Sequence, residues 1–298
     1  MTSDRINAKN ISSDEFFYGH KACAGCGGSL AVRIALKVLG ERTLLVEPAG
    51  CMSAVSFNYP QMSFKNNAII SAFAGTGAVM SGLKAGAEAM GLKDYHVLGI
   101  AGDGGTADIG IQALSGLIDR NDDVIYICYD NEAYMNTGIQ KSGLTPFGAT
   151  TTTTPAGTVG KGNIRHKKNL FEIVAAHDIP YAATASVGYI EDFADKVKRA
   201  SQVKGTSFIH VLAPCPTGWG IDTSETIEVA RQVVDNGLWY LAEYYEGEYH
   251  LNRKPKEFGD IKEYIKRQGR FKHLDDDDID EIAAQRDKTW ARIKKSFI

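Results

Sequence analysis

Four of the chain's five cysteines follow a pattern that is typical of a metal centre. Cys23 and Cys26 form a close pair, while Cys51 and Cys215 each follow a predicted strand. Glycines beside the pair let the backbone fold around sulfur, and a proline after the last cysteine recurs in ferredoxin-type ligation. Thiolates bind both zinc and iron–sulfur clusters, but zinc ribbons usually use two close pairs. The spacing favours a [4Fe–4S] cluster; a zinc site and ordinary buried cysteines are the alternatives.

A second chemical pattern lies between the cysteines. It consists of Gly102, Asp103, Gly104 and Gly105, followed at the end of the next predicted strand by Asn131. Backbone N–H groups of such a turn can face phosphate oxygens, and carboxylate and amide oxygens suit Mg²⁺. Ends of adjacent parallel strands lie side by side, so Asp103 and Asn131 are expected at one ion. The pattern predicts a magnesium–diphosphate site; two ordinary turns are the alternative.

The elements that must position these residues alternate along the chain. Four apolar runs are predicted as buried strands: residues 43–47, 96–101, 124–129 and 207–213. Five further stretches are predicted as helices: residues 29–39, 78–90, 107–120, 170–177 and 189–201. Cys128, inside the third strand, is expected to pack as a small hydrophobe. The alternation predicts an α/β fold: a doubly wound, mainly parallel sheet with helices on both faces and ligands at the strand ends.

Composition narrows the class of protein. The 298 residues carry a net charge of −3, which indicates no nucleic-acid partner. No apolar run reaches the length of a membrane span, and the polar N-terminus has no signal-peptide core. With five cysteines in such a chain, we expect a cytoplasmic protein that uses them for metal ligation or catalysis.

Two segments stand apart from the strand–helix pattern. Residues 142–162 are rich in Thr and Gly, and so long a loop is usually functional or disordered. We expect residues 1–236 to form the binding domain and residues 237–298 a C-terminal extension that packs on the core or on a partner subunit. Four aspartates, residues 275–278, precede a last helical pattern. They would favour the start of that helix, or form a solvated acidic turn.

Together these residues resemble the beta subunit of the pyruvate:ferredoxin oxidoreductase family, which is thiamine-diphosphate-dependent. The similarity runs from about Gly19 to Trp219. Its motifs are Gly102-Asp-Gly-Gly-Thr-Ala-Asp-Ile-Gly110, Tyr129-Asp-Asn-Glu-Ala-Tyr-Met-Asn-Thr-Gly138 and Thr150-Thr-Thr-Thr-Thr-Pro155. The late Gln268-Gly-Arg-Phe-Lys-His-Leu274 looks like the pyruvate branch.

The resemblance implies a set of cofactors and ligands. Cys23, Cys26, Cys51 and Cys215 would bind a [4Fe–4S] cluster. Asp103, Asn131 and the backbone carbonyl of Ala133 would bind Mg²⁺. Thiamine diphosphate would contact Tyr134, Met135, Asn136 and Thr137 as well as residues 102–105 and Cys51, with Asn136 facing the thiazolium as a catalytic residue.

The reaction implied by the resemblance is the reversible, coenzyme A-dependent oxidative decarboxylation of a small 2-oxoacid. Electrons would pass through the cluster to ferredoxin. The family's catalytic glutamate lies on a second thiamine-binding domain, so this chain looks like half an active site. A partner subunit would supply that domain, and another would carry a ferredoxin-like cluster domain.

Three other functions are open at this point. One is a non-redox thiamine decarboxylase, which needs no cluster. Another is a non-catalytic four-cysteine zinc protein. The third is the same chemistry on oxalate, indolepyruvate or a branched-chain 2-oxoacid rather than pyruvate.

Overall fold

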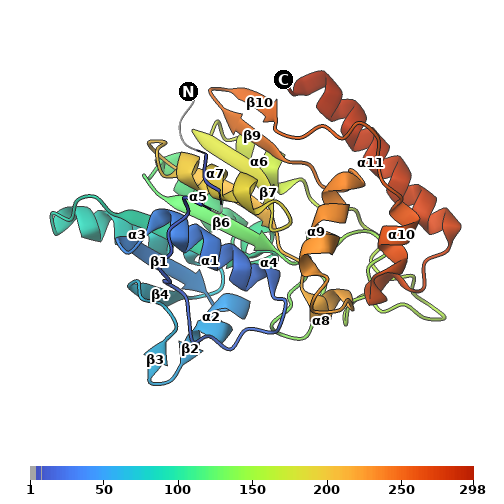
Figure 1. Cartoon of the computed structure of the whole chain (residues 1–298), viewed down its shortest axis with the longest axis horizontal. Coiled ribbons are helices and arrows are strands. Elements are labelled where there is room, and N and C mark those ends of the chain that lie inside the picture. Colours follow the sequence, from blue (N-terminus) through green and yellow to red (C-terminus); the bar gives the residue numbers. More distant parts are fainter. Residues whose placement is uncertain (1–4, 8) are drawn as a thin grey trace.

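A single twisted sheet of eight strands forms the centre of the molecule (Figure 1). The computed structural model describes residues 5–7 and 9–298. From one edge to the other the strands are β10 (Glu248–Leu251), β9 (Ala242–Tyr245), β7 (Tyr181–Ser186), β8 (Ser207–Leu212), β6 (Ile125–Asp130), β5 (His96–Gly102), β1 (Thr43–Pro48) and β4 (Ala68–Ser71). The six strands from β7 to β4 are parallel, and β9 and β10 add an antiparallel edge. The four predicted strands and the mainly parallel sheet are confirmed.

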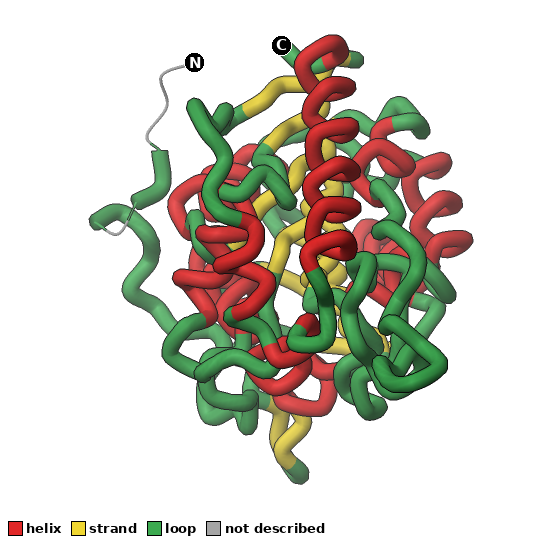
Figure 2. Tube along the Cα trace, turned by 90° about the vertical axis from the view of Figure 1, so that its right-hand side faces the viewer, coloured by secondary structure: helices red, strands yellow, loops and turns green. Residues whose placement is uncertain are grey.

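Helices cover both faces of the sheet, as Figure 2 shows edge-on. On one face α1 (Gly27–Leu39) and α7 (Ile190–Ala200) bury their apolar sides. On the other face lie α3 (Thr76–Ala89), α5 (Ile111–Arg120) and α6 (Leu170–Ala175). Because both faces are covered, the central strands are apolar throughout rather than alternating; every residue of β6 and β8 is buried.

One predicted helix is split in two. Residues 107–120 were expected to be continuous, but α4 (Asp103–Ala107) ends before α5 begins at Ile111. Asp108 lies between them with non-helical backbone angles. Its carboxylate accepts hydrogen bonds from the Tyr134 hydroxyl at 2.9 Å and the Gly143 N–H at 2.8 Å. These long-range partners outweigh local helix propensity, and they leave α4 as a short turn at the strand end.

The C-terminal residues contribute to the sheet and to a third apolar cluster. β9 and β10 extend the sheet beside β7. α9 (Thr226–Asp235), α10 (Ile261–Lys266), the 3₁₀ turn η1 (Gly269–Phe271) and α11 (Asp276–Ser296) share the third cluster. Asp275 caps α11 by accepting a hydrogen bond from the Asp278 N–H, and the Asp275 N–H donates to the Asp278 carboxylate. The acidic run therefore begins this helix, which is one of the two outcomes that the sequence left open.

Three short elements lie close to the strand ends. They are α2 (Cys51–Ser56), α8 (Pro216–Trp219) and the hairpin of β2 (Phe57–Asn58) and β3 (Gln61–Met62), which projects from the body in Figures 1 and 2. None of the helices in the described part of the chain is both long enough and apolar enough to span a bilayer.

Candidate functional site

Neighbouring parallel strands bring the candidate residues to one edge of the sheet. β8, β6, β5 and β1 are consecutive in the sheet, and they end at Leu212, Asp130, Gly102 and Pro48. The loops that follow carry Cys215, Asn131, Asp103 and Cys51. Residues more than 160 positions apart in sequence therefore meet at one place because the strands share a direction.

Three oxygen atoms converge at the ends of β5 and β6. The amide oxygen of Asn131 lies 2.9 Å from the carbonyl oxygen of Ala133 and 3.1 Å from a carboxylate oxygen of Asp103. Oxygens at this spacing repel one another unless a cation lies between them, or unless the amide turns its NH₂ toward both. Octahedral Mg²⁺ with ligands at about 2.1 Å would separate adjacent oxygens by about 2.9 Å. The arrangement fits a magnesium shell.

The backbone conformation of Glu132 allows these oxygen atoms to lie close together. Glu132 has φ of +70°, in the left-handed region that non-glycine residues rarely adopt. The turn lets the Asn131 side chain and the Ala133 carbonyl face the same point. The Glu132 carboxylate forms two ion pairs of 2.6 Å, one with Arg270 and one with Lys167. These contacts offset the cost of the left-handed backbone conformation.

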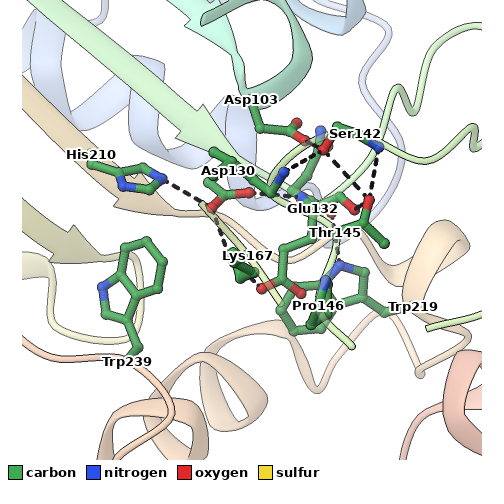
Figure 3. A network of polar contacts seen from close by, with 12 residues as sticks. Asp103, Asp130, Glu132, Ser142, Thr145, Pro146, Lys167, His210, Trp219 and Trp239 are labelled. Carbon is green, nitrogen blue, oxygen red and sulfur yellow. Dashed lines mark hydrogen bonds and ion pairs between the residues drawn. The ribbon is translucent and has the colours of Figure 1, made fainter. Parts of the chain in front are cut away.

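A network of buried charges supports the loop after β6 (Figure 3). The Lys167 ammonium lies 2.8 Å from Asp130, and the His210 ring donates to the same carboxylate at 2.9 Å. Burial alone would raise the pKa of Asp130, but Lys167 and His210 hold it below its ordinary value. Burial lowers the pKa of His210, so that histidine is neutral. Asp130 is therefore charged and fixed directly beside Asn131.

The Thr-rich loop approaches the same site. The Ser142 hydroxyl donates a hydrogen bond to Asp103, and Thr145 donates to the Glu132 carbonyl at 2.7 Å. Both side chains are buried. Burial, followed by the charge of Asp130, raises the pKa of Asp103 well above its ordinary value. A cation among the three oxygens would favour the charged carboxylate.

Four thiols gather on the other side of the site. Burial, followed by the nearby thiols of Cys215, Cys26 and Cys23, raises the pKa of Cys51 to about 12. The backbone N–H of Gly27 donates to the Pro214 carbonyl at 3.1 Å. A side chain at Gly27 would strike Ala213 at 2.7 Å, so only glycine lets these two cysteine loops meet.

The sulfurs also accept backbone hydrogen bonds. Cys26 accepts from the Ser29 N–H and Cys215 from the Gly218 N–H, each at 3.4 Å. Cys23 is exposed, while the other three are partly buried. Among residues 5–7 and 9–298, no group of three or more His, Cys, Asp or Glu side chains is arranged to hold a single metal ion. Cys128 lies apart, fully buried inside β6.

A cavity of about 250 Å³ lies at this edge of the sheet. Its lining includes Asn131, the 102–105 turn, Tyr129 and one of the four cysteines, Cys51. The remaining predicted contacts, Tyr134, Met135, Asn136 and Thr137, also line it. Asn136 and Thr137 are exposed, and the Thr137 hydroxyl donates a hydrogen bond to the Gln140 side chain.

Comparison with known proteins agrees with this geometry. Residues 48–211 match the family model "Thiamine pyrophosphate enzyme, C-terminal TPP binding domain". Ketoisovalerate oxidoreductase subunit VorB of Pyrococcus horikoshii is 49% identical over 289 residues, 95% of this chain and 93% of the relative. Pyruvate synthase subunit PorB of Methanothermobacter thermautotrophicus is 48% identical over 265 residues, which are 89% of this chain and 92% of the relative. The chain belongs to the beta subunits of the 2-oxoacid:ferredoxin oxidoreductases.

A solved structure shows that this beta subunit shares a known fold. The 2-oxoglutarate:ferredoxin oxidoreductase from Magnetococcus marinus superposes with a TM-score of 0.59 at 20% identity, covering 74% of this chain and 82% of that one. The beta subunit is one chain of a thiamine-pyrophosphate-dependent enzyme with several subunits.

Several residues of the site escaped the sequence argument. Lys167, Ser142 and His210 were not singled out, and Arg270 was noted only as part of the Gln268–Leu274 segment, without a role. The length and composition of the 142–162 loop were the signal for Ser142. For Lys167 we find no comparable signal, because its role depends on a contact across 35 residues. The contact of Arg270 with Glu132 spans 138 residues, which the motif does not reveal.

Proposed function

We propose that this beta subunit holds thiamine diphosphate through Mg²⁺ beside a [4Fe–4S] cluster. With its partner subunits it would catalyse the coenzyme A-dependent oxidative decarboxylation of a 2-oxoacid and pass the electrons to ferredoxin. The observation that supports this is one cavity whose lining includes the residues of the three converging oxygens together with Cys51, which lies near the other three thiols.

Different residues of this chain would bind the cofactor, orient the reacting carbon and exclude water. Asp103, Asn131 and the Ala133 carbonyl would anchor Mg²⁺ and through it the diphosphate, while the 102–105 turn faces the phosphates. When bound, thiamine diphosphate supplies the electron sink for loss of carbon dioxide. Asn136, exposed at the cavity, would orient the reacting carbon. Tyr129 and Met135 would exclude water between cofactor and thiols.

Two observations favour a cluster over zinc at the thiols. A single zinc ion requires four sulfurs at about 2.3 Å from one point, and no described group of side chains has that arrangement. The thiols are nevertheless close enough for their charges to interact. In a [4Fe–4S] cubane each of the four thiolates binds a different iron atom, so the sulfurs need not converge on one point. Non-redox thiamine chemistry would leave the four cysteines without a role.

The cavity lacks a second acid, which supports the need for a partner. Of the described residues that line it, only Asp103 carries a carboxyl group, and we assign that group to Mg²⁺. A glutamate that activates the cofactor must then come from another chain. We expect the isolated beta subunit to show no turnover. Adding the subunit with the second thiamine domain should restore it, and turnover by the rigorously purified single chain would contradict this.

Pyruvate is the substrate we propose, with a branched-chain 2-oxoacid as the alternative. The late Gln268–Leu274 segment favours pyruvate, but the VorB and PorB relatives are equally similar to this chain. Assaying the assembled complex against a panel of 2-oxoacids would decide. A ratio of kcat/KM that favours 2-oxoisovalerate over pyruvate would establish the alternative.

The test of the site is Asp103→Ala in the assembled complex. Removing the only carboxylate among the three oxygens should cost about 3–5 kcal/mol of cofactor affinity, or roughly 10²–10⁴-fold. The iron content should stay normal because the cysteines lie on other loops. Asp119→Ala, an exposed carboxylate on α5, is the matched control. Normal cofactor content in Asp103→Ala would show that the diphosphate binds elsewhere.

A further inference from the structure

A buried indole joins the loop of Cys215 to the loop of Asn131. Trp219 is the last residue of α8, the single helical turn that begins directly after Cys215. Its backbone N–H donates a hydrogen bond to the Cys215 carbonyl at 2.8 Å. Its indole N–H donates to the backbone carbonyl of Asn131 at 2.9 Å, and the side chain is fully buried. One residue therefore contacts a predicted thiol ligand and a predicted Mg²⁺ ligand.

An arginine holds both this indole and the same loop. The central carbon of the Arg270 guanidinium lies 3.7 Å from the centre of the Trp219 ring, which is a cation–π contact. The same guanidinium forms the 2.6 Å ion pair with Glu132, the residue after Asn131. Arg270 is 6% exposed. Because these groups are packed without access to water, a shift of the indole would either move the loop of Asn131 or leave buried polar groups without partners.

A second contact connects α8 to the wall of the cavity. A Cβ atom at Gly218, in α8, would lie 2.3 Å from the Met135 sulfur, so the Met135 side chain packs directly against this turn. Met135 lines the cavity. The Gly218 N–H also donates to the Cys215 sulfur at 3.4 Å. The single turn of α8 therefore contacts both a thiol and a residue of the cofactor cavity.

We propose that Trp219 is a positioning residue that couples the thiol set to the cofactor site, so that a cluster on the four cysteines strengthens binding of thiamine diphosphate. The inference rests on the proposed function, because both groups belong to it. A bound cluster would fix Cys215 and with it the single turn of α8. Binding of Mg²⁺ and the cofactor would then require less ordering of the Asn131 loop, which gives positive coupling. By linkage, the cofactor would strengthen cluster binding by the same factor.

The test measures binding of thiamine diphosphate to the assembled complex by calorimetry at saturating Mg²⁺, before and after its iron is removed with a chelator. We expect the wild-type Kd to be about tenfold lower with iron than without it. Trp219→Phe keeps an aromatic ring for Arg270 but removes the N–H that holds Asn131. Its Kd with iron should rise about tenfold, so that the ratio between the two states falls to about one.

Trp290→Phe is the matched control. Trp290, on α11, is 3% exposed, and its indole N–H donates to the Gly237 carbonyl at 2.7 Å. This variant also loses a buried hydrogen bond, but it should keep the wild-type ratio of Kd values. EPR of the reduced cluster adds a spectroscopic measurement: thiamine diphosphate should change the signal in wild type and Trp290→Phe and leave it unchanged in Trp219→Phe. A merely structural role for Trp219 would lower Tm without altering the Kd ratio or the EPR response.

Two results would overturn the proposal. Equal Kd values for the wild type with and without iron are the first, and this result stands even if Trp219→Phe does not fold. The second is a wild-type Kd ratio in Trp219→Phe, because a direct charge interaction between cluster and cofactor would survive a substitution that changes no charge. If the wild type with iron binds no thiamine diphosphate, the proposed function fails and the coupling fails with it. Binding without coupling refutes the coupling alone.

Discussion

Replacing Lys167 by Met should expose how much the site depends on its buried charges. The ammonium lies 2.8 Å from Asp130 and 2.6 Å from Glu132, and these carboxylates are 0% and 7% exposed. Without Lys167, Glu132 still has Arg270, but Asp130 keeps only neutral donors, the His210 ring and the Glu132 backbone N–H. Removing one partner from a buried pair costs about 3–5 kcal/mol. Lys167 is itself 20% exposed, so we expect a loss near the lower end, about 3 kcal/mol.

The stability difference between wild type and Lys167→Met should depend on pH in a defined direction. The folded pKa of Asp130 is lowered, so its contribution is present above the unfolded pKa and is lost as pH falls through the folded one. The pKa of Lys167 is raised above its ordinary value, so its charge persists throughout this range. In Lys167→Met burial would raise the pKa of Asp130 instead. The stability gap between wild type and variant should therefore be largest near neutral pH and shrink as the pH is lowered toward about 4.

Urea unfolding of the chain at about pH 7 and about pH 5, followed by tryptophan fluorescence, measures this gap. The neighbouring Lys168→Met is the matched control, because its side chain is 45% exposed and its pair with Asp108 is open to solvent. We expect the control to lose less than about 1 kcal/mol. Equal losses in the two variants, or a gap that widens on acidification, would refute the reasoning. Thiamine diphosphate affinity should fall with Lys167→Met, because Asp130 fixes the loop of Asn131.

Three further experiments, with four substitutions, test separate parts of the site. Cys215→Ala should lose the cubane while Cys128→Ala keeps it, as iron and sulfide content with EPR of the reduced state would show; an intact cubane signal in Cys215→Ala overturns the ligand assignment. Asn136→Ala should retain cofactor but lower kcat, because its side chain is exposed at the cavity; normal kcat would remove it from the reaction. Gly104→Ala should release cofactor and lower Tm, since the new Cβ would lie 2.3 Å from the Tyr134 ring; wild-type cofactor content would show that the ring yields.

Local patterns in the sequence determined much of the fold and the site. Apolar runs of strand length, with helices between them, fixed the parallel sheet, because only a sheet covered on both faces buries such runs. The same periodicity placed Asp103, Asn131, Cys51 and Cys215 after strands. Since parallel strands end at one edge, their proximity followed from the order of elements. The acidic run before α11 was compatible with a helix start or with a solvated turn, and the structure shows the helix start, a local capping interaction.

Tertiary structure decided the features that depend on distant partners. β7 is an Ala-rich strand, Tyr-Ala-Ala-Thr-Ala-Ser, whose composition favours helix, yet it pairs with β8 in the buried sheet. The break at Asp108 and the positive φ of Glu132 are held by side chains far along the chain. Lys167, Arg270 and His210 balance buried carboxylates only once the fold has removed all of them from water. Sequence indicates which residues reach the sheet edge; the folded environment sets their charges and conformations, because desolvation and pairing exist only after packing.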